Sequence, residues 1–217
     1  MFHGRHGKRK TGLCAVALAV STCVLGVGYA DDGTPSIPDS VAQSVISGNA
    51  LSQVHGVVNV NMASGDGNAQ ANAAAIALGM GNGEAAAKVH AVQSGVMSQA
   101  AGPGSATASI TDNAFANASG LISINQASGA ANIQANGIAI ALGVKGKVVA
   151  DSTLAATLSG AGPTAGPGGS SKGTREVSVS NTAFQGASGV IQVNQSAGVG
   201  NVTANSFALR VMTGATP

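Results

Sequence analysis

Residues 108–143 read ASITDNAFANASGLISINQASGAANIQANGIAIALG, and close relatives of this stretch occur once upstream and once downstream. Moved back by 64 positions it aligns with residues 44–79, and moved forward by 69 positions it aligns with residues 177–212, both without a gap. Three copies of one unit indicate a repeat protein. Each unit is too short and too poor in large side chains to bury a core alone, so we expect the copies to pack against one another.

Eight aligned positions are identical in all three copies, and we call each set of three equivalent residues a column. The asparagine columns are Asn61, Asn125, Asn194; Asn68, Asn132, Asn201; and Asn72, Asn136, Asn205. The glycine columns are Gly56, Gly120, Gly189 and Gly65, Gly129, Gly198, and the other three columns are alanines. A further column keeps a large apolar character, with Leu51, Phe115 and Phe184.

Within each copy apolar residues return at every second position, which is the period of a β-strand. They are Val58 and Val60 in the first copy, Ile122 and Ile124 in the second, and Ile191 and Val193 in the third. Glycine-containing turns separate this alternation from two others, so each copy reads as three or four short strands. The Ala-rich residues 71–78 have helical propensity, but their third counterpart, around Phe207 and Leu209, favours a strand.

Stacking the copies in register places the asparagines above one another at the spacing of about 4.7 to 4.8 Å between hydrogen-bonded strands. Side-chain amides can then bond along each column. An unpaired asparagine in a core costs about 1–3 kcal/mol, so three full columns favour stacking, although asparagine can also simply mark turns. We predict an all-β fold, a stacked three-layer β-solenoid of cross-β type, with glycine corners, a core of asparagine and apolar columns, and flexible linkers.

Residues 1–30 have the basic start, apolar run and small-residue end of a secretory signal peptide cut after Ala30. The apolar run is shorter than the roughly 18–20 residues of a membrane span, and Cys23 offers only a weak lipoprotein signal. Cleavage would remove both cysteines and four of the ten basic residues. The six left oppose eight acidic residues, a formal net charge of −2. We therefore expect no nucleic-acid partner and no membrane anchor in the mature form.

The segments around the repeats differ in composition, since all six prolines lie outside the repeats. We predict a flexible lead-in at 31–43, linkers at 80–107 and 144–176, and a tail at 213–217. In the first linker, the sequence EAAAK at 84–88 suits one or two helical turns.

Formal charges in the repeats are confined to Asp66, Asp112 and Arg210, which fall in three different columns. In a fibre, like charges would then recur at every third layer, about 14 Å apart. That exceeds the Debye length of about 8 Å. Neither end copy carries the polar cap of a soluble solenoid, so the stack should add molecules at both ends.

Residues 56–72, GVVNVNMASGDGNAQAN, with their counterparts at 120–136 and 189–205, resemble the repeat of the Fap functional-amyloid subunits of Gram-negative biofilms, FapB and FapC. The order of signal peptide, three repeats and two dissimilar linkers is also similar. The resemblance implies a periplasmic chaperone, an outer-membrane export pore, and assembly outside the cell with itself and a related amyloid subunit. Family members end in Cys-x-Cys, whereas this chain ends in MTGATP, so the resemblance does not separate a major from a nucleating subunit.

The sequence thus predicts a secreted structural protein that polymerises, and the resemblance implies that it forms extracellular amyloid fibrils of a biofilm matrix. Before assembly it should be disordered, because a Gly-rich chain with few aromatic residues gains little by collapsing alone. The alternative is a soluble β-solenoid surface adhesin or binding module. We expect no enzyme activity, cofactor or metal site, since the mature chain has two histidines and no cysteine, and His55 reads as a tolerated turn residue.

Overall fold

The computed structural model describes residues 41–80, 83–96, 104–143, 148–159 and 173–213. The expected signal peptide with its cleavage at Ala30, most of the lead-in and most of the tail lie outside these residues. The described part contains strands and no helix. The strands are β1 (Val41–Ile46), β2 (His55–Ser64), β3 (Ala69–Gly79), β4 (Ala85–Val96), β5 (Ser105–Ile110), β6 (Ser119–Ala130), β7 (Ile133–Gly143), β8 (Val148–Ser159), β9 (Arg175–Val179), β10 (Ser188–Val199) and β11 (Val202–Met212).

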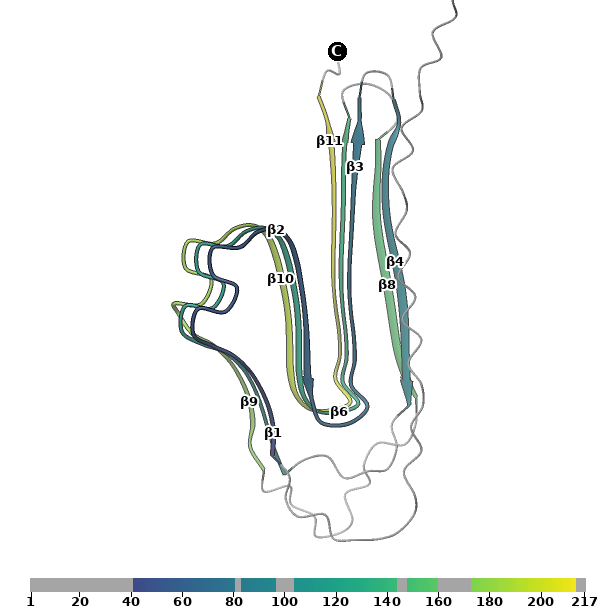
Figure 1. The fold of residues 1–217 in the computed structure, drawn as a ribbon. Coiled ribbons are helices and arrows are strands. Elements are labelled where there is room, and N and C mark those ends of the chain that lie inside the picture. Colours follow the sequence, from purple (N-terminus) through teal and green to yellow (C-terminus); the bar gives the residue numbers. More distant parts are fainter. Residues whose placement is uncertain (1–40, 81–82, 97–103, 144–147, 160–172, 214–217) are drawn as a thin grey trace, which may run out of the picture.

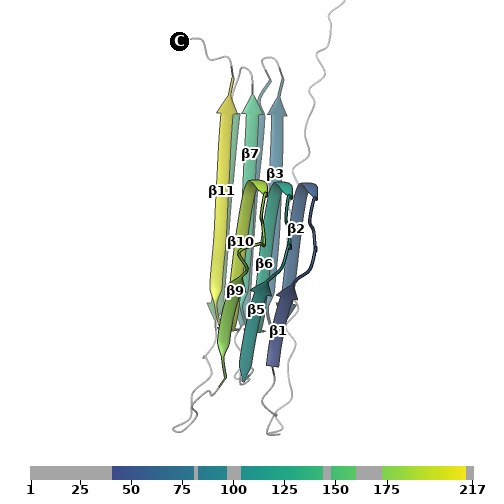
Figure 2. The same cartoon turned by 90° about the vertical axis from the view of Figure 1, so that its left-hand side faces the viewer.

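The strands form three layers, which we call rungs. Rung 1 consists of β1 to β4, rung 2 of β5 to β8, and rung 3 of β9 to β11. Equivalent strands lie side by side in parallel sheets, ordered β1-β5-β9, β2-β6-β10, β3-β7-β11 and β4-β8. Figure 2 shows the three rungs next to one another, so the stacking direction runs across the strands.

The register between rungs keeps every column together. Asn61 pairs with Asn125 and Asn125 with Asn194 in the second sheet, and the third sheet pairs Asn72, Asn136 and Asn205 in the same way. Because the copies align without gaps in sequence, equivalent residues of the repeats meet at every step of the stack. The predicted all-β, stacked, three-layer fold is therefore confirmed.

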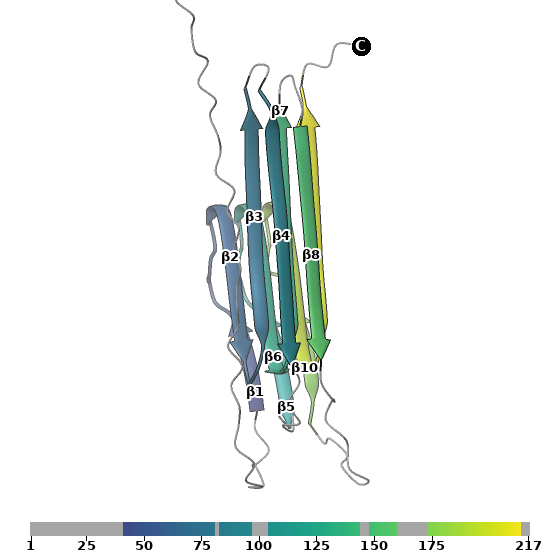
Figure 3. The ribbon, with the colours of Figure 1, turned by 90° about the vertical axis from the view of Figure 1, so that its right-hand side faces the viewer.

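Three interfaces of different chemistry hold the sheets together (Figure 1). The first and second sheets enclose an apolar cluster that includes Ile110, Phe115, Ile122 and Ile124. The second and third sheets meet through asparagine and glutamine side chains. The third sheet packs on the β4-β8 sheet through small residues such as Ala87 and Ala139, and Figure 3 shows β4 and β8 covering its other side.

The helical turn expected at residues 84–88 is wrong, because β4 begins at Ala85 and continues to Val96. Ala85, Ala87 and Val89 are buried in alternation against the third sheet. Burial of one strand face outweighs the modest helical propensity of an alanine run. The second predicted linker contains the matching strand β8, which pairs with β4 in parallel.

Each rung also starts earlier than the aligned repeat, since β1, β5 and β9 begin at Val41, Ser105 and Arg175. A search of the described residues for a helix long and apolar enough to span a bilayer found none.

Candidate functional site

Two of the asparagine columns interlock between the second and third sheets. Asn125 Nδ2 donates to Asn61 Oδ1 at 3.1 Å and to Asn72 Oδ1 at 3.0 Å, and Asn136 Nδ2 donates to Asn125 Oδ1 at 2.9 Å. Rung 3 repeats the pattern, with Asn194 Nδ2 donating to Asn125 Oδ1 at 3.0 Å. The amides also reach across to backbone carbonyls of the facing sheet. Each amide thus joins neighbouring rungs and the two sheets at once.

The third asparagine column lies at the turn between these sheets. Asn132 Nδ2 donates to Asn68 Oδ1 at 2.9 Å, and Asn201 Nδ2 donates to Asn132 Oδ1 at 2.7 Å. The backbone amides of Asn132 and Asn201 donate to the same two oxygens. This column therefore ties the turns of successive rungs together.

In the middle rung, both glycine columns occupy positions where no other residue fits. Gly120 and Gly129 have φ of +122° and +111°, values that L side chains rarely adopt. A Cβ on Gly120 would overlap the carbonyl oxygen of Gly56 in rung 1, and a Cβ on Gly129 would overlap that of Gly198 in rung 3. Glycine here permits the backbones of neighbouring rungs to approach, at bends of the strands.

The large apolar column lies in the turn between the first and second sheets. Leu51, Phe115 and Phe184 all adopt a left-handed backbone, with φ of +55°, +61° and +63°. Such a conformation costs a bulky residue about 1–3 kcal/mol. Phe115 is fully buried and its ring stacks on Phe184 with centroids 5.0 Å apart, so burial and stacking offset that cost. No local pattern in the sequence indicates the left-handed turn.

The predicted apolar columns lie in the cluster between the first two sheets. Ile122 and Ile124 of the middle rung are fully buried, and Val58, Val60, Ile191 and Val193 of the outer rungs pack against them while half-buried. The difference follows from position, since the middle rung is covered on both sides.

Sequence reasoning missed a set of glutamine contacts. Gln126 Nε2 donates to the carbonyls of Ser44 and Ser109, both at 2.9 Å, and connects the first and second sheets. Gln134 Nε2 donates to the Gln126 carbonyl at 3.0 Å and connects the second and third. Gln70 and Gln134 share a column and could have indicated these contacts. The third copy has Thr203 at this position, so the column is not identical in all three copies.

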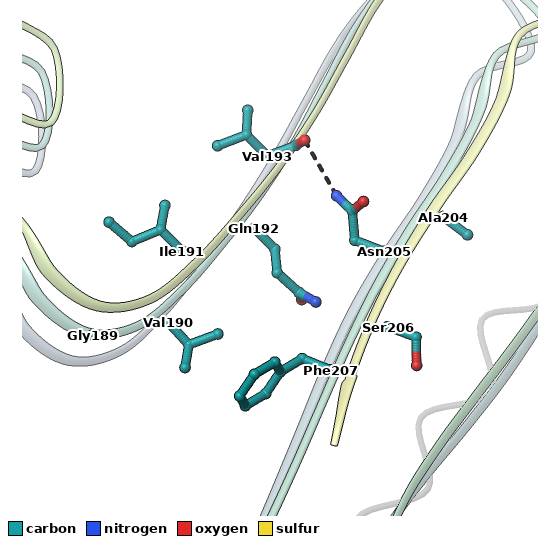
Figure 4. Close-up of a pocket in the computed structure, with 9 residues that line it drawn as sticks. All are labelled: Gly189, Val190, Ile191, Gln192, Val193, Ala204, Asn205, Ser206 and Phe207. Atoms are coloured by element: carbon teal, nitrogen blue, oxygen red, sulfur yellow. Dashed lines mark hydrogen bonds between the residues drawn. The ribbon is translucent and has the colours of Figure 1, made fainter. Parts of the chain in front are cut away.

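No described residue covers either end of the stack. Asn61 and Asn125 share a column, yet Asn61 is exposed on rung 1 while Asn125 is fully buried. On rung 3 a hollow of about 650 Å³ lies between β10 and β11, and Figure 4 shows Gln192 and Phe207 reaching into it. Both ends therefore present strand edges and core side chains to solvent.

Titratable side chains are dispersed in the part of the chain that the structure describes. No group of three or more His, Cys, Asp or Glu side chains gathers there in a way that could hold a metal ion. His55 Nδ1 lies 2.6 Å from Ser119 Oγ at the exposed start of β2, and the Asp112 carboxylate accepts the Gly48 amide at 2.9 Å. These contacts link rungs.

A parallel, in-register stack with asparagine ladders and open ends defines a β-solenoid of cross-β type, the arrangement of amyloid. The chain matches the functional amyloid protein FapB/FapC family over residues 27–212 and belongs to that family. This is a family of structural amyloid proteins and not of enzymes. No solved structure matches the chain.

Proposed function

We propose that this protein is a structural subunit of extracellular fibrils that strengthen a biofilm matrix, and that its activity is polymerisation. One observation carries the proposal: rungs related by a simple displacement leave unpaired edges of the same columns at both ends of the molecule. Unprotected strand edges are templates for adding further strands. The asparagine, glycine and apolar columns described above would then form the fibril core.

Export is part of the proposal. We propose that residues 1–30 direct the chain to the periplasm, that cleavage follows Ala30, and that a chaperone and an outer-membrane pore deliver a disordered chain to the outside. Membership of the family supports this route. Mass spectrometry of the protein recovered from cells should find Asp31 at the mature N-terminus, and an intact leader on the extracellular protein would contradict it.

The decisive experiment uses purified residues 31–217. At high concentration the chain should pass from a monomer without regular structure to sedimentable, thioflavin-binding fibrils. Their diffraction should show reflections near 4.7 Å and 10 Å, the strand and sheet spacings. A chain that stays monomeric, whether unstructured or folded, would contradict polymerisation, and a folded monomer would favour the soluble adhesin alternative.

A further inference from the structure

Backbone amides show that the two ends of the molecule are complementary. Three rung 2 amides, of Thr111, Phe115 and Ser119, donate to rung 1 carbonyls at 2.8 to 2.9 Å. Rung 3 repeats this toward rung 2 with Ser180, Phe184 and Ser188. The equivalent amides of rung 1 therefore point out of the molecule, and so do the equivalent carbonyls of rung 3. The outward amides are Ser47, Leu51 and His55, and the outward carbonyls are Val179, Ala183 and Ala187.

Other columns donate in the opposite direction. The Ala69 amide donates to the Asn132 carbonyl at 2.8 Å, and the Ile133 amide donates to the Asn201 carbonyl at 2.7 Å. The third member of this column, Val202, thus directs its amide out of rung 3, while the Asn68 carbonyl faces out of rung 1. In these columns, each outward donor on one end has an acceptor in the same position on the other end, whereas the β4-β8 sheet has no described strand in rung 3.

The asparagine side chains add a direction of their own. In all three columns Nδ2 of a higher rung donates to Oδ1 of the rung below. The rung 1 end therefore offers the Nδ2 of Asn61, and the rung 3 end offers asparagine oxygens such as Asn201 Oδ1. Donor and acceptor ends differ, so the stack has a polarity.

We propose, building on the stacking function above, that filaments of this protein are polar and grow head to tail. The rung 3 end of one molecule receives the rung 1 end of the next, by the displacement that relates one rung to the next. Such a heterologous contact does not close and generates an open filament. The partner is a second copy of this chain in one orientation only.

Side-chain size and charge fit the same junction. The hollow on rung 3 is lined by Gln192 and Phe207, and head-to-tail stacking sets Asn59 opposite Gln192 and Ala74 opposite Phe207, in each case a smaller residue than the one it faces. Arg175 lies beside Gly198 on rung 3, with its Cδ 3.5 Å from where a Cβ would be. The same stacking places Asp66 of the next molecule one residue from that point, so a basic and an acidic residue lie on the two sides of the junction.

Proline variants can block one end at a time, because proline lacks the amide and its ring would meet the incoming carbonyl. Ser47→Pro acts on an amide that points out of rung 1, and Val202→Pro acts on the first residue of β11, a tolerated place for proline. The matched controls are Ser180→Pro and Ala69→Pro in the same two columns. There the amide donates inside the molecule, so these controls should weaken the fold and fail to cap filaments.

The test follows labelled variants on wild-type fibrils under a microscope that resolves both ends. Ser47→Pro should dock at one end and abolish elongation there, and Val202→Pro should do so at the opposite end. Both together should stop growth completely. The proposal is overturned if either variant stops both ends, if both stop the same end, or if growth continues past a docked variant.

If the proline variants do not dock onto fibrils, a second pair of variants tests the polarity. Gly56→Ala would direct a Cβ out of rung 1, and Gly198→Ala would direct one out of rung 3, with no backbone of the same molecule in the way, although alanine strains the chain at these positive φ values. Each of these two variants should also stop growth at one end only, and the two should act at opposite ends. If none of the four variants caps a single end, the proposed polarity is overturned. Absence of wild-type fibrils would instead contradict the proposed function itself.

Discussion

At the scale of residues, position in the stack decides how much an asparagine matters. Asn125 is fully buried and exchanges hydrogen bonds with Asn61, Asn136 and Asn194. A buried polar group that loses its partner pays its full desolvation penalty. The middle member of a column should therefore contribute more than either end member.

We predict that Asn125→Ala destabilises fibrils by about 1–3 kcal/mol, the cost of leaving a buried polar partner unsatisfied. The measurement is the denaturant concentration at which half the fibril dissociates, which should fall. Asn113→Ala is the matched control, since Asn113 is exposed in a turn. Equal midpoints for the two variants would show that the ladder contributes nothing.

At the scale of elements, the β4-β8 sheet is the main difference between expectation and structure. A flexible linker would leave residues 85–96 and 148–159 open to solvent, whereas the structure pairs them in register. The offset between rungs is 64 for the first strands, as in Val41 and Ser105, but 63 for β4 and β8, as in Ala85 and Val148. A gapless comparison of the repeats therefore misses this fourth strand.

We predict that backbone amides of β4 and β8 resist hydrogen exchange in fibrils as strongly as those of β7. Ala87→Asp should abolish that protection, because it forces a carboxylate into the alanine-rich interface with Ala139, where an unpaired charge is strongly disfavoured. Ala86→Asp is the control one residue away, on the exposed face. Fast exchange of both strands in wild-type fibrils would contradict this prediction and support flexible linkers.

At the scale of the whole molecule, charge is sparse and never repeated within a column of the aligned repeats. Asp66 shares its column with Ala130 and Val199. In a filament of stacked molecules that column then carries one carboxylate in every three rungs. Separation by three layers, about 14 Å, exceeds the Debye length of about 8 Å at physiological salt.

We predict that the double variant Ala130→Asp with Val199→Asp makes fibril assembly depend on salt. Carboxylates would follow one another at about 4.8 Å, where two charges in water repel by about 0.9 kcal/mol. Fibril yield should fall at about 0.01 M salt, where the Debye length is about 30 Å, and recover near 1 M, where it is about 3 Å. The control, Ala130→Asn with Val199→Asn, should show no such dependence.

Three aligned copies, the alternation of Val58 and Val60, and full asparagine columns were enough to predict an all-β stack from the sequence. These signals are local or repeat in register, so a parallel stack follows from them once identical residues are placed together. The left-handed backbone of Phe115 and the Gln126 contacts to Ser44 and Ser109 could not be predicted. Both depend on which sheets face each other, and no local pattern states that.

The sequence by itself determined that equivalent residues form columns, because its repeats are in register without gaps and carry glycine where backbones must approach. Only the tertiary structure decided which columns face one another across sheets and where residues 85–96 and 148–159 pack. It also decided which way each amide points at the two ends. The physical reason is that hydrogen-bond direction and sheet packing depend on the path of the whole chain through space, which composition and period do not encode.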